Sequence, residues 1–479
     1  MKSIKIPSEL KKMNEIFERN GFEAFLVGGA VRDEIMGKKA SDWDVTTNAR
    51  PEDVMRIFHK VIPTGIAHGT VTVHLLGHEI EVTTYRAEAG YSDGRHPDSV
   101  SFDATLEDDL SRRDFTMNAI AASLADGKLV DPFGGIGDIQ AKIIRTVGNA
   151  RERFLEDGLR PIRAIRFSSQ LEFPIEDETF RAISDSDVQE KICSISMERF
   201  RDEFVKILSS KKPSIALKRM EDCGILAKFM PELSECRGIE QTDERGFHEF
   251  DVLDHNLFAC DGAPRENLNV RLAALFHDIG KKDAKREETK EFPKGSGEFV
   301  KIVHFHGHDK LSSEKSAEIL ARLKFPNATI ERVSHLIRNH MTFFDGSWSD
   351  AAVRRFLVRI RPECVDDLFD LWCADMYGKH CVPVVPGSDA AKRMGLLRDK
   401  IREIEESQNA LSLKDLKVNG KDLIAAGIPA GKHLGMILGE LFQCVLDDPA
   451  MNEKERLMEL ARNLAESRNL ANPNSSASE

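Results

Sequence analysis

The sequence has no long hydrophobic run. None of its apolar stretches approaches the ~20 residues that span a bilayer. The N-terminal stretch MKSIKIPSELKKMNEIF is charged and amphipathic, without the apolar core of a signal peptide. We therefore expect a cytoplasmic protein that does not enter a membrane. The sequence also shows no internal repeat of fixed period.

Cysteines are few and an excess of positive charge is lacking. The eight cysteines lie between Cys193 and Cys444 and form no C-x-x-C pair, which predicts reduced, mostly structural thiols. The formal net charge of −12 argues against a basic surface for indiscriminate nucleic-acid binding. It leaves room for a local basic groove, and residues 142–166, which carry seven basic side chains against three acidic ones, are a candidate.

The chain is too long for one ordinary core. At 479 residues, two to four domains are expected. The first 150 residues alternate strand-like and helix-like segments, and 71–76 and 79–85 predict a hairpin with a short turn at Gly77-His78. From about Arg151 helical periodicity dominates, interrupted most clearly by CVPVVPGS at 381–388. The sequence thus predicts an α+β fold: a small head with a mixed sheet, then a long helical body and a disordered end, NPNSSASE.

A strand-turn-helix unit begins at Phe25. The apolar run FLV ends at Gly28-Gly29, and a helix-compatible segment follows. A turn without Cβ atoms lets backbone N–H groups approach a phosphate closely. The sequence therefore predicts a phosphate-binding turn here.

Two aspartates, Asp42 and Asp44, follow about a dozen residues later. In a strand, residues i and i+2 project from the same face, so both carboxylates would converge on one point. Paired hard oxygen ligands beside a phosphate-binding turn are typical of a magnesium site for nucleotidyl transfer. Glu81 on the neighbouring hairpin strand is a candidate third ligand or supporting residue. The alternative is a solvated strand edge.

Arginines flank this unit. Arg32, on the first turn of the expected helix, can grip phosphate bidentately, or else form a surface ion pair with Asp33. The block Arg112–Ala119 (RRDFTMNA) offers arginines and an aspartate for phosphate and ribose hydroxyls, and an asparagine that both donates and accepts. By composition alone it is equally well a charged helix N-terminus.

Seven segments together resemble a known family. The chain is similar to the class II tRNA nucleotidyltransferases, the CCA-adding enzymes, which share their head with bacterial poly(A) polymerases. The matching pieces cover roughly residues 20–205 and are LVGGAVRD, SDWDVTT, EVTTYR, RRDFTMNAIA, DPFGGIGDI, EDGLRPIRAIRFSSQL and ERFRDEF.

The resemblance implies roles for individual residues. Asp42 and Asp44 would hold Mg²⁺ for catalysis, and the turn would bind the triphosphate. The side chains and backbone implied in nucleotide binding are Gly28, Gly29, Arg32, Arg113, Asp114, Asn118, Asp157, Arg160, Arg163 and Arg166. Among these, Asp157 and Arg160 would pair with the edge of the incoming base, C or A, and Arg163 and Arg166 would support them.

Physical arguments agree in part with these roles. Asp157 can act as an N-cap and Pro161 is tolerated in a first turn, so a helix starting here would hold Asp157 and Arg160 at its end. Residues three apart drift around a helix, so Arg166 is expected to face away from Asp157 and to meet RNA or a neighbouring helix. The alternative for this set is a helix laced with ion pairs.

Three members of the superfamily remain open: a CCA-adding enzyme, a poly(A) polymerase and an enzyme that adds only A. After RRDFT the chain continues MNAIA, as CCA-adding enzymes do, whereas poly(A) polymerases look more like NALYY. Residues 87–104 resemble the flexible loop of enzymes that add C, and their Gly, Asp and Ser content suits a mobile lid. These features favour CCA addition.

A second site is indicated in the helical body. His255, His277-Asp278 and Asp375 reproduce the H…HD…D pattern of HD metal-dependent phosphohydrolases. Imidazole and carboxylate groups suit a transition metal or magnesium. His308 and His340 fall where HD proteins with a second metal place further histidines, and Lys281 is a candidate phosphate contact. The alternative is a relic domain that only holds RNA.

Two further segments stand out. Residues 285–303, rich in Lys and Glu, depart from the compact HD pattern, and their role is open; His304 and His306 are expected to belong to this loop. Residues 416–446 resemble the family's tail, which contacts the body of tRNA, although plain helix packing explains them equally well.

The resulting prediction is a CCA tRNA nucleotidyltransferase that uses CTP, ATP and tRNA. The predicted domains are a nucleotidyltransferase head (1–150), a helical neck (151–235), an HD domain with a possible second divalent metal (236–385) and a tRNA-binding tail (386–479). A rival function is an HD phosphohydrolase with a degenerate head. The sequence leaves the oligomeric state open.

Overall fold

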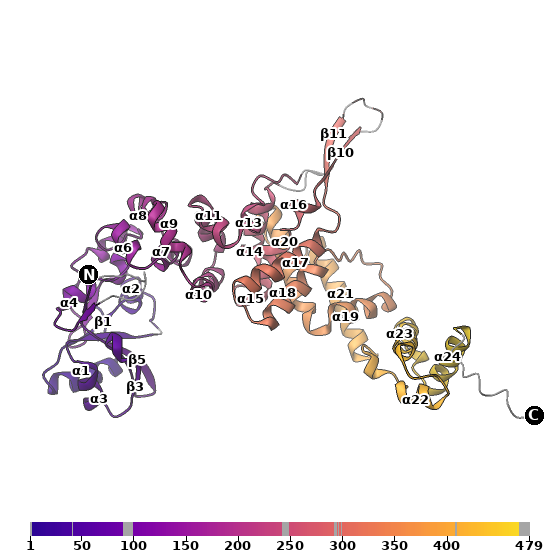
Figure 1. Cartoon of the computed structure of the whole chain (residues 1–479), viewed down its shortest axis with the longest axis horizontal. Coiled ribbons are helices and arrows are strands. Elements are labelled where there is room, and N and C mark those ends of the chain that lie inside the picture. Colours follow the sequence, from indigo (N-terminus) through magenta and orange to yellow (C-terminus); the bar gives the residue numbers. More distant parts are fainter. Residues whose placement is uncertain are drawn as a thin grey trace, which may run out of the picture. The chain divides into compact units, whose positions relative to one another are not determined.

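The computed structural model describes residues 2–40, 42–89, 99–241, 249–291, 295, 297, 299–407 and 410–468. Two compact units are present (Figure 1). The N-terminal unit comprises residues 1–235 and 320–325, and the C-terminal unit comprises residues 236–319 and 326–479. Residues 90–98 of the expected lid and the expected disordered end at 472–479 lie outside the described residues.

The N-terminal unit is built on a seven-stranded sheet. Its strand order is β3-β4-β5-β2-β1-β8-β9, and β2 and β5 run parallel while the other pairs are antiparallel. The strands are β1 Ala24–Val27, β2 Asp44–Thr47, β3 Val61–Gly65, β4 Thr70–Leu75, β5 His78–Thr84, β8 Ala121–Ser123 and β9 Leu129–Val130. A separate pair joins β6 Ala87–Ala89 to β7 Ser99–Ser101. The predicted mixed sheet is confirmed.

The β4–β5 hairpin follows from its sequence. Alternating β-branched residues put Val71, Val73, Ile80 and Val82 in the core. Leu75 pairs with His78, so the two-residue turn is Leu76-Gly77, one position before the expected Gly77-His78. Both turn residues have positive φ (53° and 85°), as a tight hairpin turn that matches the twist of the strands requires.

Short helices surround this sheet, followed by a run of further helices. The helices of the first group are α1 Ser8–Arg19, α2 Gly29–Ile35, α3 Pro51–Ile57, α4 Leu106–Ser111 and α5 Gly135–Ala141. The run contains α6 Ala150–Glu156, α7 Leu159–Leu171, α8 Asp177–Ile183, α9 Ser186–Cys193, α10 Met197–Leu208, α11 Pro213–Asp222, α12 Ile225–Phe229 and α13 Pro231–Ser234. Side-chain oxygens of Asn149, Glu176, Asp185 and Ser196 accept hydrogen bonds from the first turns of α6, α8, α9 and α10. Capping thus sets where these helices begin.

The C-terminal unit is mainly helical. Its first helices are α14 Val252–Gly262, α15 Leu268–Phe276, α16 Lys281–Ala284, α17 His308–Arg322, α18 Asn327–Asn339, α19 Asp350–Ile360 and α20 Val365–His380. Helices α14 and α20 pack closely through glycines. A Cβ on Gly262 would lie 2.6 Å from the Cβ of Tyr377, and one on Gly378 would lie 2.8 Å from the His255 carbonyl oxygen. This close packing fixes His255 against α20.

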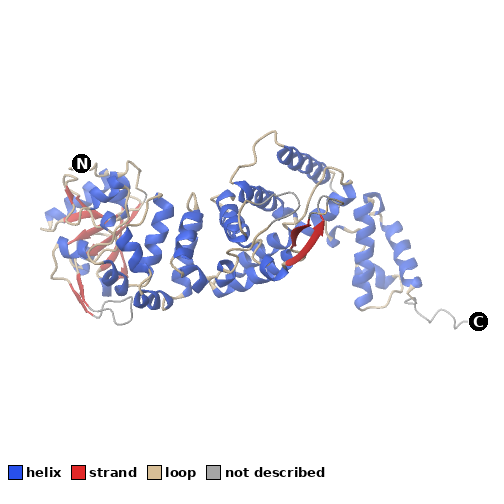
Figure 2. Ribbon diagram, turned by 90° about the horizontal axis from the view of Figure 1, so that it is seen from above, coloured by secondary structure: helices blue, strands red, loops and turns tan. Residues whose placement is uncertain are grey.

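A β-hairpin interrupts the helices of this unit (Figures 1 and 2). Strands β10 Arg286–Glu291 and β11 Phe299–His304 pair antiparallel, with Arg286 opposite His304. The insertion that the sequence singled out at 285–303 is therefore a two-stranded projection within a region expected to be helical. His304 ends β11, and His306 lies between β11 and α17.

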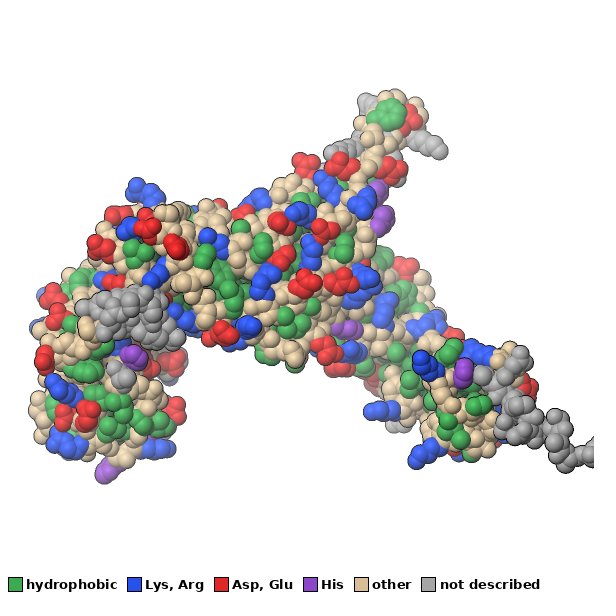
Figure 3. Space-filling view, viewed as in Figure 1, with side chains coloured by type: hydrophobic (Ala, Val, Ile, Leu, Met, Phe, Trp, Pro, Cys, Tyr) green, Lys and Arg blue, Asp and Glu red, His purple; other side chains and the backbone are tan. Residues whose placement is uncertain are grey.

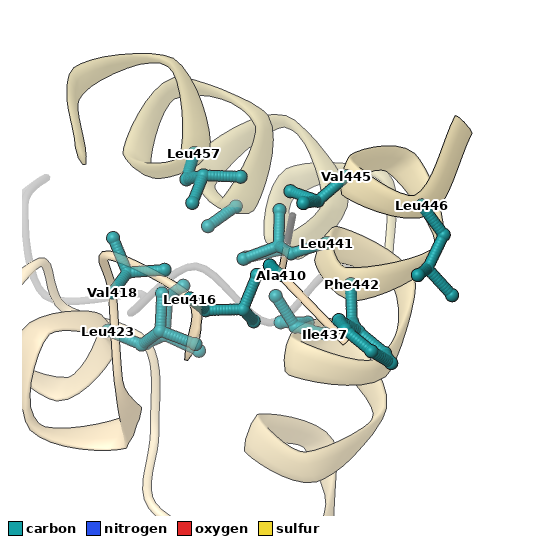
Figure 4. Packing of buried hydrophobic residues seen from close by; sticks show 13 residues of the cluster. Ala410, Leu416, Val418, Leu423, Ile437, Leu441, Phe442, Val445, Leu446 and Leu457 are labelled. Carbon is teal, nitrogen blue, oxygen red and sulfur yellow. The ribbon is translucent and has the colours of Figure 1, made fainter. Parts of the chain in front are cut away.

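The end of the chain forms a small helical core (Figure 4). Its helices are α22 Gly420–Ala425, α23 Lys432–Asp447 and α24 Lys454–Ser467, whereas α21 Asp389–Glu406 precedes them and packs on α19. Ile437 and Leu441 of α23 are completely buried, as is Leu457 of α24. Arg354 of α19 donates hydrogen bonds to the carbonyl oxygens of Leu446 (2.7 Å) and Asp447 (3.1 Å), which satisfies the end of α23.

Two expectations from composition can be compared with the fold. In the part of the chain that the structure describes, no helix is both long and apolar enough to cross a bilayer. All eight cysteines are free thiols. On the face drawn in Figure 3, Lys and Arg side chains are interspersed with Asp and Glu.

Candidate functional site

The turn between β1 and α2 requires glycine. Gly28 caps α2 with φ of 70°, a conformation that favours glycine. A Cβ there would also lie 3.2 Å from Nη1 of Arg113 and 3.6 Å from Oδ2 of Asp44. The glycine therefore lets a guanidinium and a carboxylate stand directly against the turn.

Three carboxylates face the same region. Asp44 is the first residue of β2 and lies in register with Glu81 on the parallel strand β5. Asp42 precedes the strand, so the expectation that both aspartates alternate within one strand is wrong; β2 begins only at Asp44. Asp42 and Asp44 nevertheless line one cavity of about 460 Å³ together with Gly28 and Gly29.

The negative charges of these carboxylates repel one another, and burial adds to the cost of ionising them. Asp44 opens onto the cavity, but the surrounding walls withdraw it from bulk water and raise its pKa, against the opposing charge of Arg113, and Asp42 adds to the rise. Burial, and then the charge of Asp44, raise the pKa of Glu81. A divalent cation held by Asp42 and Asp44 would relieve this repulsion, and carboxylate oxygens are the donors that Mg²⁺ prefers. The residues present therefore fit the metal.

A chain of hydrogen bonds joins the cavity's polar side chains. Arg32 donates to Oδ1 of Asn118 (2.9 Å), whose amide donates to Oδ1 of Asp114 (3.1 Å). Arg163 donates to Oδ2 of Asp114 (2.8 Å). Arg32 also donates to Asp33 (2.9 Å), the ion pair considered as the alternative. Burial would raise the pKa of Asp114, but Arg163 and Asn118 outweigh it and hold the pKa at about 2.

A second cavity of about 400 Å³ shares four side chains with the first: Asp44, Arg113, Asp114 and Arg163. It is also lined by Asp157 and Arg160. Asp157 accepts from Nη2 of Arg199 (2.7 Å), while Arg160 pairs with Glu156 and donates to the carbonyl oxygen of Arg112 (3.0 Å). The two cavities therefore adjoin at these four polar side chains.

The predicted N-cap of α7, Asp157, is wrong by one residue. Helix α7 begins at Leu159 with Gly158 as its N-cap, because Asp157 is still the C-cap of α6. The Asp157 carboxylate nevertheless accepts from the backbone N–H of Leu159 (2.9 Å), so it is held at the helix end. Asp157 and Arg160 therefore share one end of α7, as expected.

Arg166 faces a neighbouring helix. It is buried and pairs with Glu203 of α10 at 2.5 Å, and Glu203 is itself bound by Lys206 (3.0 Å). Its guanidinium also covers the ring of Phe167 at 3.9 Å, and Arg32 approaches the same ring at 5.2 Å. The sequence left two partners open for Arg166, RNA or a neighbouring helix, and in the structure Arg166 contacts the neighbouring helix α10.

Several supporting residues were not identified from the sequence. Asp109 is fully buried and forms ion pairs with Arg112 (2.7 Å) and Arg113 (3.5 Å), which hold both guanidinium groups in position. Arg199 and Glu203 lie in ERFRDEF, a segment that carried the family resemblance but no assigned role. The repeated pairing of acids with arginines in the recognised segments was the only available signal.

The second predicted site is assembled by three helices of the C-terminal unit, α14, α17 and α20, and by the residues that directly follow α15 and α18. Nε2 of His255 lies 3.1 Å from Nε2 of His277, 3.4 Å from Asp278 and 3.2 Å from Asp375. Nε2 of His277 lies 3.4 Å from Asp278 and 3.5 Å from Asp375. The H…HD…D residues therefore converge on one buried point.

A second group adjoins the first through a shared aspartate. Oδ1 of Asp278 lies 3.1 Å from Nε2 of His308 and 3.7 Å from Nε2 of His340. In His277, His308 and His340, Nδ1 contacts a backbone carbonyl oxygen at 2.6–2.8 Å. A carbonyl only accepts, so Nδ1 donates and Nε2 is the nitrogen turned to the centre, where it would bind a cation once it is deprotonated. These two three-residue groups fit two divalent cations bridged by Asp278.

The two aspartates are held as carboxylates. Burial would raise the pKa of Asp278, but the charges of His277 and Lys281 keep it well below its usual range. Hydrogen bonds from His255 and His277 outweigh burial in the same way and depress the pKa of Asp375. The ammonium group of Lys281 lies 2.5 Å from Oδ2 of Asp278, so in this structure Lys281 forms an ion pair with the aspartate that the two groups share. Both acids are thus ready to bind a cation.

Family models match four segments of the chain. They are described as "Poly A polymerase head domain" (24–145), "Probable RNA and SrmB- binding site of polymerase A" (172–236), "HD domain" (256–370) and "tRNA nucleotidyltransferase domain 2 putative" (387–461). The head and HD matches contain Asp42, Asp44, His277 and Asp278. Asp375 lies just beyond the HD match.

Whole-length relatives agree with these matches. The chain is 34% identical to a CCA-adding enzyme of Lactobacillus johnsonii, covering 94% of each chain, and 34% identical to one of Ligilactobacillus salivarius, covering 96% of this chain and 98% of that one. A crystal structure of the Bacillus stearothermophilus CCA-adding enzyme in complex with CTP matches with a TM-score of 0.71 and 28% identity, over 96% and 98% of the two chains. The chain belongs to the family of CCA-adding enzymes.

Proposed function

We propose that this chain adds C, C and A to the 3′ ends of tRNA from CTP and ATP and releases pyrophosphate. The observation that carries the proposal is that the two cavities of the N-terminal unit adjoin and share four polar side chains. One contains the glycine turn and the paired aspartates, and the other contains Asp157 and Arg160. A triphosphate in the first places a base in the second. The names of the relatives, and the CTP complex of one of them, support the same reaction.

In this proposal each part of the site has one task. Asp42 and Asp44 would hold Mg²⁺, which would supply activation of the attacking 3′-hydroxyl and charge neutralisation for the leaving pyrophosphate. The Gly28-Gly29 backbone and Arg32 bind the triphosphate, and Arg113, Asp114 and Asn118 orient the ribose and phosphates.

The base is recognised by the end of α7. Asp157 accepts and Arg160 donates, so the pair can read the edge of C or A without a nucleic-acid template. Arg163 supports the pair through Asp114, and Arg166 through its contact with α10. We propose no direct contact between Arg166 and the nucleotide, because Glu203 and Phe167 occupy its guanidinium.

The test uses three tRNA transcripts, which end before the CCA, after C and after CC. Each is incubated with the protein, Mg²⁺ and labelled CTP or ATP, and all three are expected to reach a finished CCA end and stop. Addition restricted to the CC-ended transcript would identify an A-adding enzyme, and a long A ladder a poly(A) polymerase.

Two substitutions give the matched comparison. Asp42→Ala removes a metal ligand and is expected to abolish transfer without unfolding the unit. Asp53→Ala removes a carboxylate of α3 that contacts Arg56, outside both cavities, and is expected to leave transfer unchanged. Near-normal turnover of Asp42→Ala would refute the proposal.

The HD centre supports a second activity, hydrolysis of a phosphoester. The two ligand groups that share Asp278 favour it, because two cations at one bridge can clamp a phosphate and activate water. Hydrolysis with added divalent metal is expected to stop in His277→Ala and after chelation, and to continue in Asp42→Ala. The opposite pattern would place hydrolysis in the head.

The free thiols and the tRNA substrate suit a cytoplasmic enzyme.

A further inference from the structure

An apolar pocket of about 280 Å³ adjoins the HD centre. Its lining includes His340 and Asp375, which belong to the two ligand groups just described, so the pocket opens beside the buried point where those side chains converge. Its volume is slightly below the ~300–1,000 Å³ typical of ligand sites. The pocket thus fits one nucleoside-sized group.

The walls of the pocket are aromatic and held in place. Trp372 donates its indole N–H to the carbonyl oxygen of His340 (2.9 Å) and packs edge-on against Phe369 at 5.2 Å. Phe344 is buried, whereas Phe343 is 70% exposed at the rim. Met341, which also lines the pocket, is 61% exposed, so the rim carries two neighbouring exposed apolar side chains, and such a patch beside a pocket indicates a binding surface.

Two basic side chains, Arg393 and Lys379, also line the pocket. Arg393 lies over the Phe343 ring at 5.8 Å, and Lys379 contacts Oδ2 of Asp375 at 3.3 Å. Arg393 lies on α21, within the segment matched to the second tRNA nucleotidyltransferase domain rather than to the HD domain. The helix that follows the HD core therefore supplies one wall of the pocket.

We propose that this pocket is the base-binding subsite of the HD centre, and that the centre's substrates are phosphate esters of single nucleosides. A base stacks between Phe343, Arg393 and Trp372, while the phosphate reaches the cluster through Asp375 and Lys379. The flat aromatic faces and the guanidinium suit a heterocycle, and the metal ligands suit its phosphate. This inference rests on the proposed hydrolytic function for its chemistry, but base binding is measurable without it.

The first test measures binding of AMP, ribose 5-phosphate, octyl phosphate and inorganic phosphate to the full chain in EDTA, by calorimetry. AMP is expected to bind about tenfold more tightly than ribose 5-phosphate. Phe343→Ala and Arg393→Ala are each expected to remove most of that advantage. Equal binding of AMP and ribose 5-phosphate, or a preference for octyl phosphate, would overturn the inference.

Matched controls exist on the same unit. Phe299→Ala removes an equally exposed ring, 70%, from β11, and Leu396→Ala removes an exposed side chain of α21 that does not line the pocket. Both are expected to bind AMP as the parent chain does. An equal loss in either control would also overturn the inference.

The second test separates the subsite from the chemistry. Hydrolysis of AMP and of ribose 5-phosphate is measured with Mn²⁺, and a higher kcat/KM for AMP that falls in Phe343→Ala supports the inference. Hydrolysis of both esters without preference would refute the subsite and retain the hydrolase. AMP binding that is sensitive to Phe343→Ala, without any hydrolysis, would refute the hydrolase and retain the subsite.

Discussion

Replacing Asp114 by asparagine is expected to destabilise the N-terminal unit in a pH-dependent way. Arg163 and Asn118 hold the pKa of this buried carboxyl at about 2, against an ordinary value of 3.8. Since one pKa unit corresponds to about 1.4 kcal/mol, ionised Asp114 stabilises the fold by about 2.5 kcal/mol. Asn keeps the size of the side chain but not its charge, so Asp114→Asn should lose about this amount at neutral pH.

The pH profile gives the sign of the effect. Because the folded pKa lies below the unfolded one, the stabilisation is complete above about pH 4 and disappears as the pH falls towards 2. The difference between the parent chain and Asp114→Asn should therefore be the same at pH 7 and pH 5 and should shrink below pH 4.

Urea unfolding followed by the fluorescence of Trp43 measures this difference. The other two tryptophans, Trp348 and Trp372, belong to the C-terminal unit and are replaced by Phe in the background chain. Asp202→Asn, at an exposed ion pair of the same unit, is the control and should change stability by less than about 1 kcal/mol. A loss that stays constant down to pH 3, or no loss at pH 7, would refute the reasoning.

Three further substitutions test other parts of the structure. Gly28→Ala puts a Cβ beside Arg113 at a position with positive φ, so the KM for CTP and ATP should rise. Steady-state kinetics measure this change, and an unchanged KM would contradict the role of the turn. Glu203→Gln leaves the buried Arg166 without its counter-charge and should cost about 3 kcal/mol in urea unfolding. Leu441→Ala opens a cavity in the last helical core and should cost about 3 kcal/mol, measured by hydrogen exchange in α23; native protection there would contradict the packing.

Local features of the fold were predictable because their causes are local. The alternation in β4 and β5 and the glycine between them predict the hairpin, and the structure confirms it within one residue. The N-cap assigned to Asp157 was wrong because Asp157 still ends α6, and periodicity does not place the boundary between two consecutive helices. Asp42 was assigned to a strand that begins two residues later, because the D-x-D spacing does not fix where pairing with the neighbouring strands starts.

Partners across the fold were not predictable. Arg199 meets Asp157 and Glu203 meets Arg166 only because α10 packs on α7, about 40 residues further along the chain. No periodic or turn signal encodes such a pair. The HD residues were found through their family pattern, whereas their arrangement around Asp278, shared by two groups, appears only in three dimensions.

The hairpin β10–β11 leaves and re-enters the C-terminal unit between two ligands of one centre. Asp278 precedes the hairpin in the sequence and His308 follows it. The chain segments on its two sides are also joined, because the N–H of Gly280 donates to Oγ of Ser312 (2.9 Å). Closing a longer loop costs only ~0.6 kcal/mol for each doubling of its length, so an insertion into this hairpin should cost the unit little stability. The hairpin is therefore a suitable graft point for an affinity tag or a fluorophore, because it lies between Asp278 and His308 in the sequence and contains none of the HD ligands.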